Sequence, residues 1–207
     1  MTSALNKAVH DLCSRRTTIA LELGCGSRKA DPSAIGIDIS DASGVDLVGD
    51  ALLIMRLFDD DSVDSISSRH FLEHISDVAE MMTEVTRIVK PHGEITITVP
   101  HYSSSFYYSD VTHKTVFALY TFCYLAQSSL FKRRVPEYAL IPGLCLTDVT
   151  LGFKSSSSWP FRYGLRMAFG YLFNASRYLQ EFWEENLAGV VSAYEITYKL
   201  SKIIDDR

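Results

Sequence analysis

Short apolar segments and one amphipathic helix alternate along the first hundred residues. Apolar runs at 18–23, 34–39, 45–48, 63–67 and 94–99 have the length of buried strands. One apolar stripe recurs at helical spacing and consists of Val78, Met81, Met82, Val85, Ile88 and Val89. Ser76 or Asp77 can cap this helix, and the turn-like residues 90–93 (KPHG) end it. The pattern predicts an α/β fold with a doubly wound, mostly parallel sheet.

The second half of the chain differs from the first in its aromatic content. Residues 101–207 hold 22 of the 24 aromatic residues. Parallel strands are buried on both faces and use small and aliphatic residues, whereas large amphipathic rings shape pockets. We therefore expect a helical, aromatic-rich cap or binding surface in this half. The alternative is that the later elements simply pack with aromatic side chains.

Residues 161–187 are expected to be helical and to carry apolar and aromatic residues over much of their surface. Arg162, Arg166 and Arg177 are interspersed among them. A basic amphipathic helix of this kind can lie on a membrane surface or contact a lipid-linked molecule. The alternatives are a core helix or a dimer face. Residues 132–134 (KRR) form a basic cluster, either a solvated face or a contact for an anionic ligand.

Composition narrows the class of protein. The chain has 207 residues, 47% of them hydrophobic and 22% charged, which suits one globular domain and excludes a disordered or collagen-like chain. The four cysteines lie far apart without a CxxC pair, and the N-terminus lacks an apolar signal core, so we expect a cytoplasmic protein. A net charge of −5 without a long basic run argues against nucleic acid as a partner.

The strongest local motif is LELGCGSRK at 21–29. A strand that ends in Gly-x-Gly lets backbone approach a ligand closely. The motif is neither a dehydrogenase fingerprint, whose third glycine would fall at Lys29, nor a P-loop. Glu22, Asp38 and Asp50 lie at the ends of successive expected strands, where carboxylates can accept protons from ribose hydroxyls or an exocyclic amine. The alternative is that Asp38 and Asp50 only cap helices or turns.

At this point the sequence resembles a known family. LELGCG, GIDIS, VGDA, VDSISSRHFLEHISD and EVTRIVKPHGEITITVP, in that order, are similar to class I S-adenosylmethionine-dependent methyltransferases of the methyltransferase-11 type. The resemblance implies a Rossmann-like, seven-stranded sheet, with the last strands at Cys145–Phe153 and Ala193–Lys202, and an inserted acceptor cap. It also implies one methyltransferase domain over residues 1–207, with the cofactor-binding half at about 17–100 and the cap and last strands at about 101–207. The cofactor-contacting residues that it implies are Glu22, Gly24, Cys25, Gly26, Asp38, Ile39, Asp50, Ala51, Ser68, Arg69 and His70.

Two departures from the family pattern affect the cofactor site. The usual third glycine would be at position 28, which is Arg28. The stretch between Gly26 and the second strand is also too short for a full-length first helix. The cofactor's carboxylate is then expected to be held differently, by Arg28 or Lys29.

A competing motif lies at 70–74, where HFLEH matches the inverted zinc-hydrolase pattern HxxEH. That pattern needs a long helix and a third ligand, whereas Ser76 and Asp77 begin a new helix directly afterwards. We therefore expect no metal site, and His74 is interpreted as a structural hydrogen-bonding residue.

The loop after the strand at 94–99 carries the candidate catalytic residues. DVTHKTVFALYTF at 110–122 resembles a D-x-T-H stretch of related small methyltransferases. Histidine is the side chain best suited to take a proton from a hydroxyl acceptor, so His113 and His101 are candidate bases, with Asp110 as orienter. The alternative is that Asp110 and His113 only pin the loop. The expected reaction is transfer of a methyl group from S-adenosylmethionine to a hydroxyl of a small-molecule or glycan-like acceptor. The competing hypothesis is a catalytically silent relative that acts through a partner.

Overall fold

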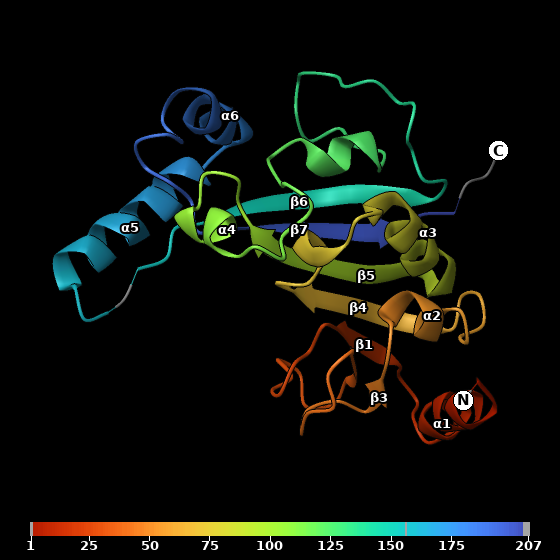
Figure 1. Cartoon of the computed structure of the whole chain (residues 1–207). Helices are drawn as coiled ribbons and strands as arrows, with labels where there is room; N and C mark the ends of the chain where they lie inside the picture. Colours follow the sequence, from red (N-terminus) through yellow and green to blue (C-terminus); the bar gives the residue numbers. More distant parts are fainter. Residues whose placement is uncertain (1, 156, 205–207) are drawn as a thin grey trace.

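A computed structural model describes residues 2–155 and 157–204 of the chain. Its centre is a seven-stranded sheet with the order β3-β2-β1-β4-β5-β7-β6 (Figure 1). The strands are β1 (Ala20–Leu23), β2 (Ile35–Asp38), β3 (Leu47–Val48), β4 (Val63–Arg69), β5 (Val89–Pro100), β6 (Leu144–Gly152) and β7 (Glu195–Lys202). All seven expected strands are therefore present, including the two expected in the second half.

The sheet is mixed. Every pairing from β3 to β5 is parallel, whereas β7 lies between β5 and β6 and runs antiparallel to both. The carboxyl ends of β1, β2, β4 and β5 consequently meet at one edge of the sheet, where α4 (Ser105–Ser109) also lies (Figure 1). Ligands of open α/β sheets bind outside the carboxyl ends of the strands.

The remaining helical elements are α1 (Thr2–Ser14), α2 (Ala51–Met55), α3 (Val78–Ile88), α5 (Pro160–Phe173), α6 (Arg177–Asn186), and the 3₁₀ turns η1 (Leu72–His74) and η2 (Thr121–Tyr124). The expected helix at 76–89 is α3, and the Asp77 side chain caps it by accepting a hydrogen bond from the Glu80 N–H. The helices α1 and α2 were not expected from the sequence.

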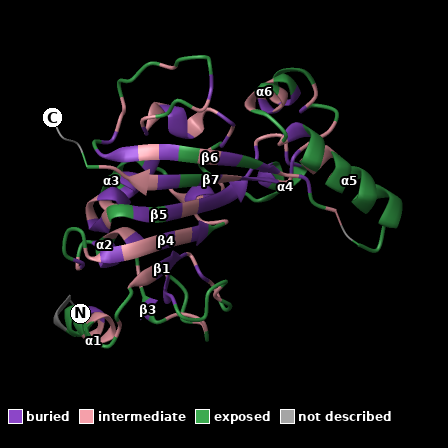
Figure 2. Cartoon of the chain, turned by 180° about the vertical axis from the view of Figure 1, so that it is seen from behind, coloured by how far each residue is buried: buried purple, intermediate pink, exposed green. Residues whose placement is uncertain are grey.

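The expected doubly wound strand order is present, but within the described part of the chain one face of the central strands carries no helix. Figure 2 shows β4, β5 and β7 from behind with no helix in front of them. Paired positions on this face are Ser67, Thr96 and Lys199, all at least partly exposed. Their neighbours on the other face, Ile66, Ile95 and Leu200, are buried.

The length of two connections explains this uncovered face. Right-handed crossovers place the β1–β2 and β2–β3 connections on the same face, opposite to the connections that contain α2 and α3. Residues 24–34 and 39–46 form these two connections, and both are irregular throughout. The face that they should cover therefore keeps the alternating, polar pattern of a solvated sheet.

The expected single helix at 161–187 is also corrected, because it is two helices. The Asn174 side chain bonds to backbone of Leu151 on β6 and ends α5, and Ser176 then caps α6 by accepting from the Leu179 N–H. The helix α5 projects from the end of the sheet and is exposed over most of its length (Figure 2). Among the described residues, no helix has both the length and the apolarity needed to cross a bilayer. Contact of this segment with a membrane surface or a lipid-linked acceptor stays a prediction.

Candidate active site

Two glycines with left-handed backbone shape the loop after β1. Gly24 has φ +66° and Gly26 has φ +56°, a region that side chains disfavour. A Cβ on Gly24 would lie 2.6 Å from the Phe71 side chain, so the glycine lets the loop pack against the segment after β4. The corresponding position on Gly26 has no atom within 4 Å. The loop therefore presents bare backbone to open space at the carboxyl edge of the sheet.

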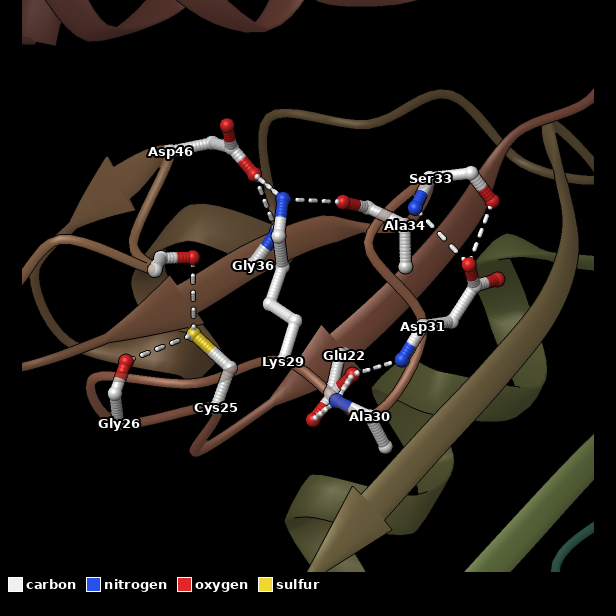
Figure 3. A network of polar contacts seen from close by, with 11 residues as sticks. Glu22, Cys25, Gly26, Lys29, Ala30, Asp31, Ser33, Ala34, Gly36 and Asp46 are labelled. Carbon is white, nitrogen blue, oxygen red and sulfur yellow. Dashed lines mark hydrogen bonds and ion pairs between the residues drawn. The ribbon is translucent and has the colours of Figure 1, made fainter.

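Residues that the sequence assigned to a ligand instead hold this loop in place (Figure 3). Glu22 accepts hydrogen bonds from the N–H groups of Ala30 and Asp31. Lys29 donates to the Ala34 carbonyl and forms a 2.7 Å ion pair with Asp46. Residues 24–34 form no helix. The two N–H groups bonded to the buried Glu22 carboxylate and the ion pair between Lys29 and Asp46 hold these residues in place instead. Arg28, by contrast, is exposed.

The Cys25 side chain also belongs to this scaffold. Its Sγ lies 3.7 Å from the carbonyl oxygens of Gly26 and Gly44. Burial, with help from the nearby carboxylates of Asp38 and Glu22, raises the pKa of the Cys25 thiol to about 11. The thiol therefore stays protonated at neutral pH, and the Cys25 side chain is buried within the loop.

Asp38 is the last residue of β2, and Ile39 follows it. The Asp38 carboxylate can bind a hydroxyl group of a ligand, and the Ile39 side chain can contact a flat apolar ring beside that group. The Asp38 carboxylate accepts from the Gly26 N–H and from the N–H and hydroxyl of Ser40. Burial would raise the pKa of Asp38, but these hydrogen bonds outweigh it and lower that pKa. A carboxylate has about four acceptor positions, so one remains for a ligand hydroxyl. Ile39 follows directly and is 80% exposed.

Asp50 and Ala51 stand at the start of α2. Asp50 is the N-cap of α2 and accepts from the Leu53 N–H through Oδ1, as the capping alternative predicted. Ala51 is buried as the first residue of the helix.

Ser68, at the end of β4, is buried, and its hydroxyl has no hydrogen-bond partner among the described residues. Since buried polar groups are almost always bonded, Ser68 has capacity for a ligand at this edge.

A cavity of about 500 Å³ opens beside this edge. Its lining includes His70, Glu73, His74, Asp110, His113 and Tyr194. These residues come from the turn after β4, the coil after α4 and the residue before β7, and the end of β5 and α4 also line the cavity. The structure thus brings together the HFLEH motif and the predicted loop residues Asp110 and His113, which are distant in the sequence.

His113 presents one free ring nitrogen to the cavity. Its Nδ1 lies 2.8 Å from the Tyr107 carbonyl oxygen, which can only accept, so Nδ1 carries the proton. The Nε2 lone pair then lies 3.7 Å from Asp110 Oδ2 and 4.0 Å from Glu73 Oε1. This arrangement can bind a hydroxyl group or a cation.

His101, the other candidate base, is not brought to the cavity. It is 0% exposed, its Nδ1 contacts Ser103 Oγ at 2.8 Å, and its Nε2 lies 3.0 Å from Glu184 Oε2. The ring packs against Tyr102 and Trp183. Nε2 therefore holds α6 to the loop after β5, and Nδ1 is engaged within that loop, so we leave His101 out of the catalytic set.

Arg69 and His70 face a carboxylate that sequence reasoning missed. Glu195, the first residue of β7, is buried and lies 2.6 Å from Lys154, 3.3 Å from Arg69 and 3.5 Å from His70. Burial would raise the pKa of Glu195, but the contacts with His70 and Lys154 lower it to about 2. The carboxylates of Glu195 and Glu73 raise the pKa of His70 to about 9. No local motif marks Glu195, because only the pairing of β7 with β5 brings it here.

Comparisons with known proteins agree with this architecture. Residues 21–97 match the family model described as a methyltransferase domain, Methyltransf_11. The fold is similar to a SAM-dependent methyltransferase from Archaeoglobus fulgidus, with TM-score 0.55, 16% identity and coverage of 97% of this chain and 94% of that one. A putative methyltransferase from Bacillus halodurans gives TM-score 0.56, 14% identity and coverage of 98% and 100%.

A third similar structure is a phosphoethanolamine N-methyltransferase 2 from Haemonchus contortus, in complex with phosphomonomethylethanolamine and S-adenosylhomocysteine. Its TM-score is 0.53 at 16% identity, and the match covers 97% of this chain and 52% of that one. No curated protein sequence matches the chain. At these identities the structural likeness concerns the fold.

Proposed function

We propose that this chain, a class I S-adenosylmethionine-dependent methyltransferase of the Methyltransf_11 type, methylates a hydroxyl group of a small-molecule or glycan-like acceptor. In this proposal the whole chain works as one unit. Residues up to β5 bind the cofactor, and the segments after β5 form the acceptor side. The observation that carries the proposal is the cavity in which imidazole and carboxylate groups gather beside the carboxyl ends of the strands.

The residues at the edge of the sheet fit S-adenosylmethionine. The spare acceptor position of Asp38 suits a ribose hydroxyl, and the exposed Ile39 side chain suits one face of adenine. The open side of Gly26 leaves room that a Cβ would fill. Asp50, Ala51 and the unpartnered Ser68 hydroxyl complete the proposed contacts. The cofactor supplies an electrophilic methyl group on a sulfonium.

The carboxylate of the cofactor needs a different partner in this chain. In many nucleotide sites a helix N-terminus supplies N–H groups and a favourable dipole for anions, but residues 24–34 contain no helix. Lys29 is already paired with Asp46. We therefore assign the carboxylate to Arg28, whose guanidinium can bind it in a bidentate manner.

The pair Arg28 and Lys29 provides a test of this assignment. Arg28→Ala is expected to weaken binding of S-adenosylhomocysteine about tenfold, since a charge-assisted hydrogen bond contributes roughly 1.5 kcal/mol, and to leave the melting temperature of the free protein unchanged. Lys29→Ala is expected to lower that melting temperature, because it breaks the scaffold of the loop. Isothermal titration and thermal unfolding measure the two effects. Equal affinity of wild type and Arg28→Ala would refute the assignment.

On the acceptor side, a hydroxyl oxygen must give up its proton as it attacks the methyl group. A neutral amine can attack without a base, because its nitrogen already has a nucleophilic lone pair. We propose that His113, with its Nε2 lone pair in the cavity, contacts the acceptor hydroxyl. Asp110, 3.7 Å from this nitrogen, orients the imidazole and the hydroxyl. Phe106 and Tyr194, whose rings contact each other at 5.4 Å between centroids, form an aromatic wall of the same cavity. Aromatic walls are typical of sites for sugars and other small rings.

His113→Ala is expected to lower kcat/KM for hydroxyl acceptors by about 100-fold or more and to leave the affinity for S-adenosylhomocysteine unchanged. The assay measures release of S-adenosylhomocysteine with a panel of sugars, phenols and matched amines. His92→Ala, at an exposed position near the start of β5 and remote from the cavity, is the control. Turnover of amines alone would refute O-methylation. Cofactor binding with no turnover of any acceptor would favour the silent binding module instead.

A further inference from the structure

Three potential metal ligands meet in the cavity. Glu73 and His74 lie in η1, and His113 follows α4. One ligand atom of each side chain lies within 4.8 Å of the corresponding atoms of the other two. The cluster contains two imidazoles and one carboxylate, and it lines the same cavity that we assign to the acceptor.

Glu73 is the strongest indication that this cluster binds a ligand. The residue is 1% exposed, and neither of its carboxylate oxygens has a hydrogen-bond partner in the described part of the chain. Its nearest charged or polar neighbours are imidazoles, His70 Nδ1 at 3.5 Å and His113 Nε2 at 4.0 Å. His70 lies at ion-pair distance from this carboxylate but makes no hydrogen bond to it, and buried carboxylates normally accept hydrogen bonds or coordinate metals.

The hydrogen bonds of both histidines leave a lone pair on Nε2. His113 donates from Nδ1 to the Tyr107 carbonyl. The Thr112 hydroxyl has one proton, which it gives to Asp110 Oδ1 at 2.6 Å, so at 2.9 Å from His74 Nδ1 it can only accept. His74 therefore also carries its proton on Nδ1. Metal-binding histidines characteristically donate their second ring N–H to a carbonyl or a carboxylate-linked group in this way.

We propose that Glu73, His74 and His113 bind a divalent transition-metal ion, for which zinc is the best fit, with an open coordination position facing the cavity. A His₂Glu set with open positions is the donor set of catalytic zinc and related sites. Ligand atoms on a tetrahedral ion with bonds of about 2.0–2.1 Å lie about 3.3 Å apart. The 4.0 Å between Glu73 and His113 must therefore shorten, and so must the other separations, which reach up to 4.8 Å. Asp110 adds negative charge beside the site.

The ligand set differs from that of the HxxEH pattern, which would use His70 and His74 one helical turn apart. Here η1 is a three-residue 3₁₀ turn, and His70 has φ +53°, with its ring nitrogens beside Glu73 and Glu195. His113, from a distant segment, supplies the third ligand instead of His70. The two ligand sets therefore predict opposite results for a His70 variant.

This inference rests on the proposed O-methylation and deepens it. The acceptor hydroxyl would occupy the open position, where a metal ion makes its O–H bond more acidic. The proton leaves to water in the open cavity. The acceptor oxygen then forms the new C–O bond, and the electron pair of the breaking C–S bond stays on sulfur. With the metal bound, His113 contacts the acceptor through the ion rather than as a free base.

The test is zinc binding to the full chain after removal of metals with a chelator. One equivalent of zinc chloride is expected to bind in competition with a chromophoric chelator, and cobalt is expected to give the strong visible bands of a four-coordinate site. His74→Ala, His113→Ala and Glu73→Gln should each weaken zinc binding by about 100-fold or more. His70→Ala and the exposed His10→Ala should change it by no more than a few-fold. If Glu73→Gln does not fold, the two histidine variants decide the question.

Two further outcomes separate this inference from the proposed function. In the first, wild type binds no zinc and the metal-free protein methylates hydroxyl acceptors at the full rate. That result would overturn the metal site and leave O-methylation standing. Zinc bound through the three residues, with turnover of amines alone, would support the metal site and overturn O-methylation. Loss of zinc binding in His70→Ala but not in His113→Ala would overturn the proposed ligand set.

Discussion

Gly24→Ala is expected to lower the free energy of unfolding by about 3 kcal/mol, from left-handed strain of about 1–2 kcal/mol and an overpacking cost of similar size. The added Cβ would lie 2.6 Å from the Phe71 Cβ, and both atoms are fixed to backbone. Phe71 follows His70, whose own left-handed backbone turns the chain back against the loop after β1. Neither segment can move without disturbing the sheet beside it. For a chain of this length we expect a fall in melting temperature of roughly 10 °C.

Gly26→Ala is the matched control for this prediction. Gly26 has nearly the same φ, but the space around its Cβ position is open, so the cost is strain alone, about 1 kcal/mol. Because the proposed cofactor occupies that space, Gly26→Ala is expected to weaken S-adenosylhomocysteine binding more than its effect on stability would suggest. Thermal unfolding with and without the ligand measures both quantities. Equal melting temperatures for the two variants would show that contact with Phe71 carries no energy.

Trp183→Ala is expected to cost about 3–5 kcal/mol of unfolding free energy. Trp183 is 0% exposed, its Nε1–H donates to the Val191 carbonyl at 2.9 Å, and its ring packs against Phe153, Phe173 and His101. Truncation leaves both a large cavity and an unpaired carbonyl. Because His101 is held in the same cluster, we expect the loop after β5 to loosen as well. Urea unfolding followed by circular dichroism measures the loss.

The chain's other tryptophan serves as the control. Trp159 is 66% exposed just before α5, so Trp159→Ala should change stability by no more than about 0.5 kcal/mol. The single-tryptophan variant Trp159→Phe then leaves Trp183 as a fluorescent reporter of the core. A Trp183→Ala protein as stable as Trp159→Ala would mean that Trp183 does not pack against Phe153 and Phe173 as described.

The strands could be predicted because their signals are local. The apolar runs after residues 17, 33 and 62 and the β-branched run at 94–99 all became strands, and Asp77 caps α3 as its position suggested. The division of the 161–187 segment had a weaker local signal in Asn174 and Ser176. What decides it is the bond of Asn174 to Leu151, which depends on tertiary structure.

The candidate site could be predicted only in part, for the same reason. His101 and His113 stand on one loop and looked equivalent in sequence. Glu184, more than eighty residues away, binds His101 and removes it from the cavity, whereas His113 is held by the Tyr107 carbonyl and has its other nitrogen among groups that line the cavity. Glu195 carries no motif at all. The uncovered sheet face was not predicted, although the short stretch between Gly26 and β2, one of its two causes, was visible in the sequence.

The place of β7 in the sheet has a consequence for how the protein folds during synthesis. Strands β1 to β5 can pair with one another as they emerge, but β6 has no partner until β7 is made, because β7 lies between β5 and β6. Pairs such as Glu94 with Ser201 close loops of about a hundred residues, so this step is expected to be slow. Until then the edge of β5 and both edges of β6 stay open to other chains. We expect nascent protein to depend on chaperones mainly during this interval.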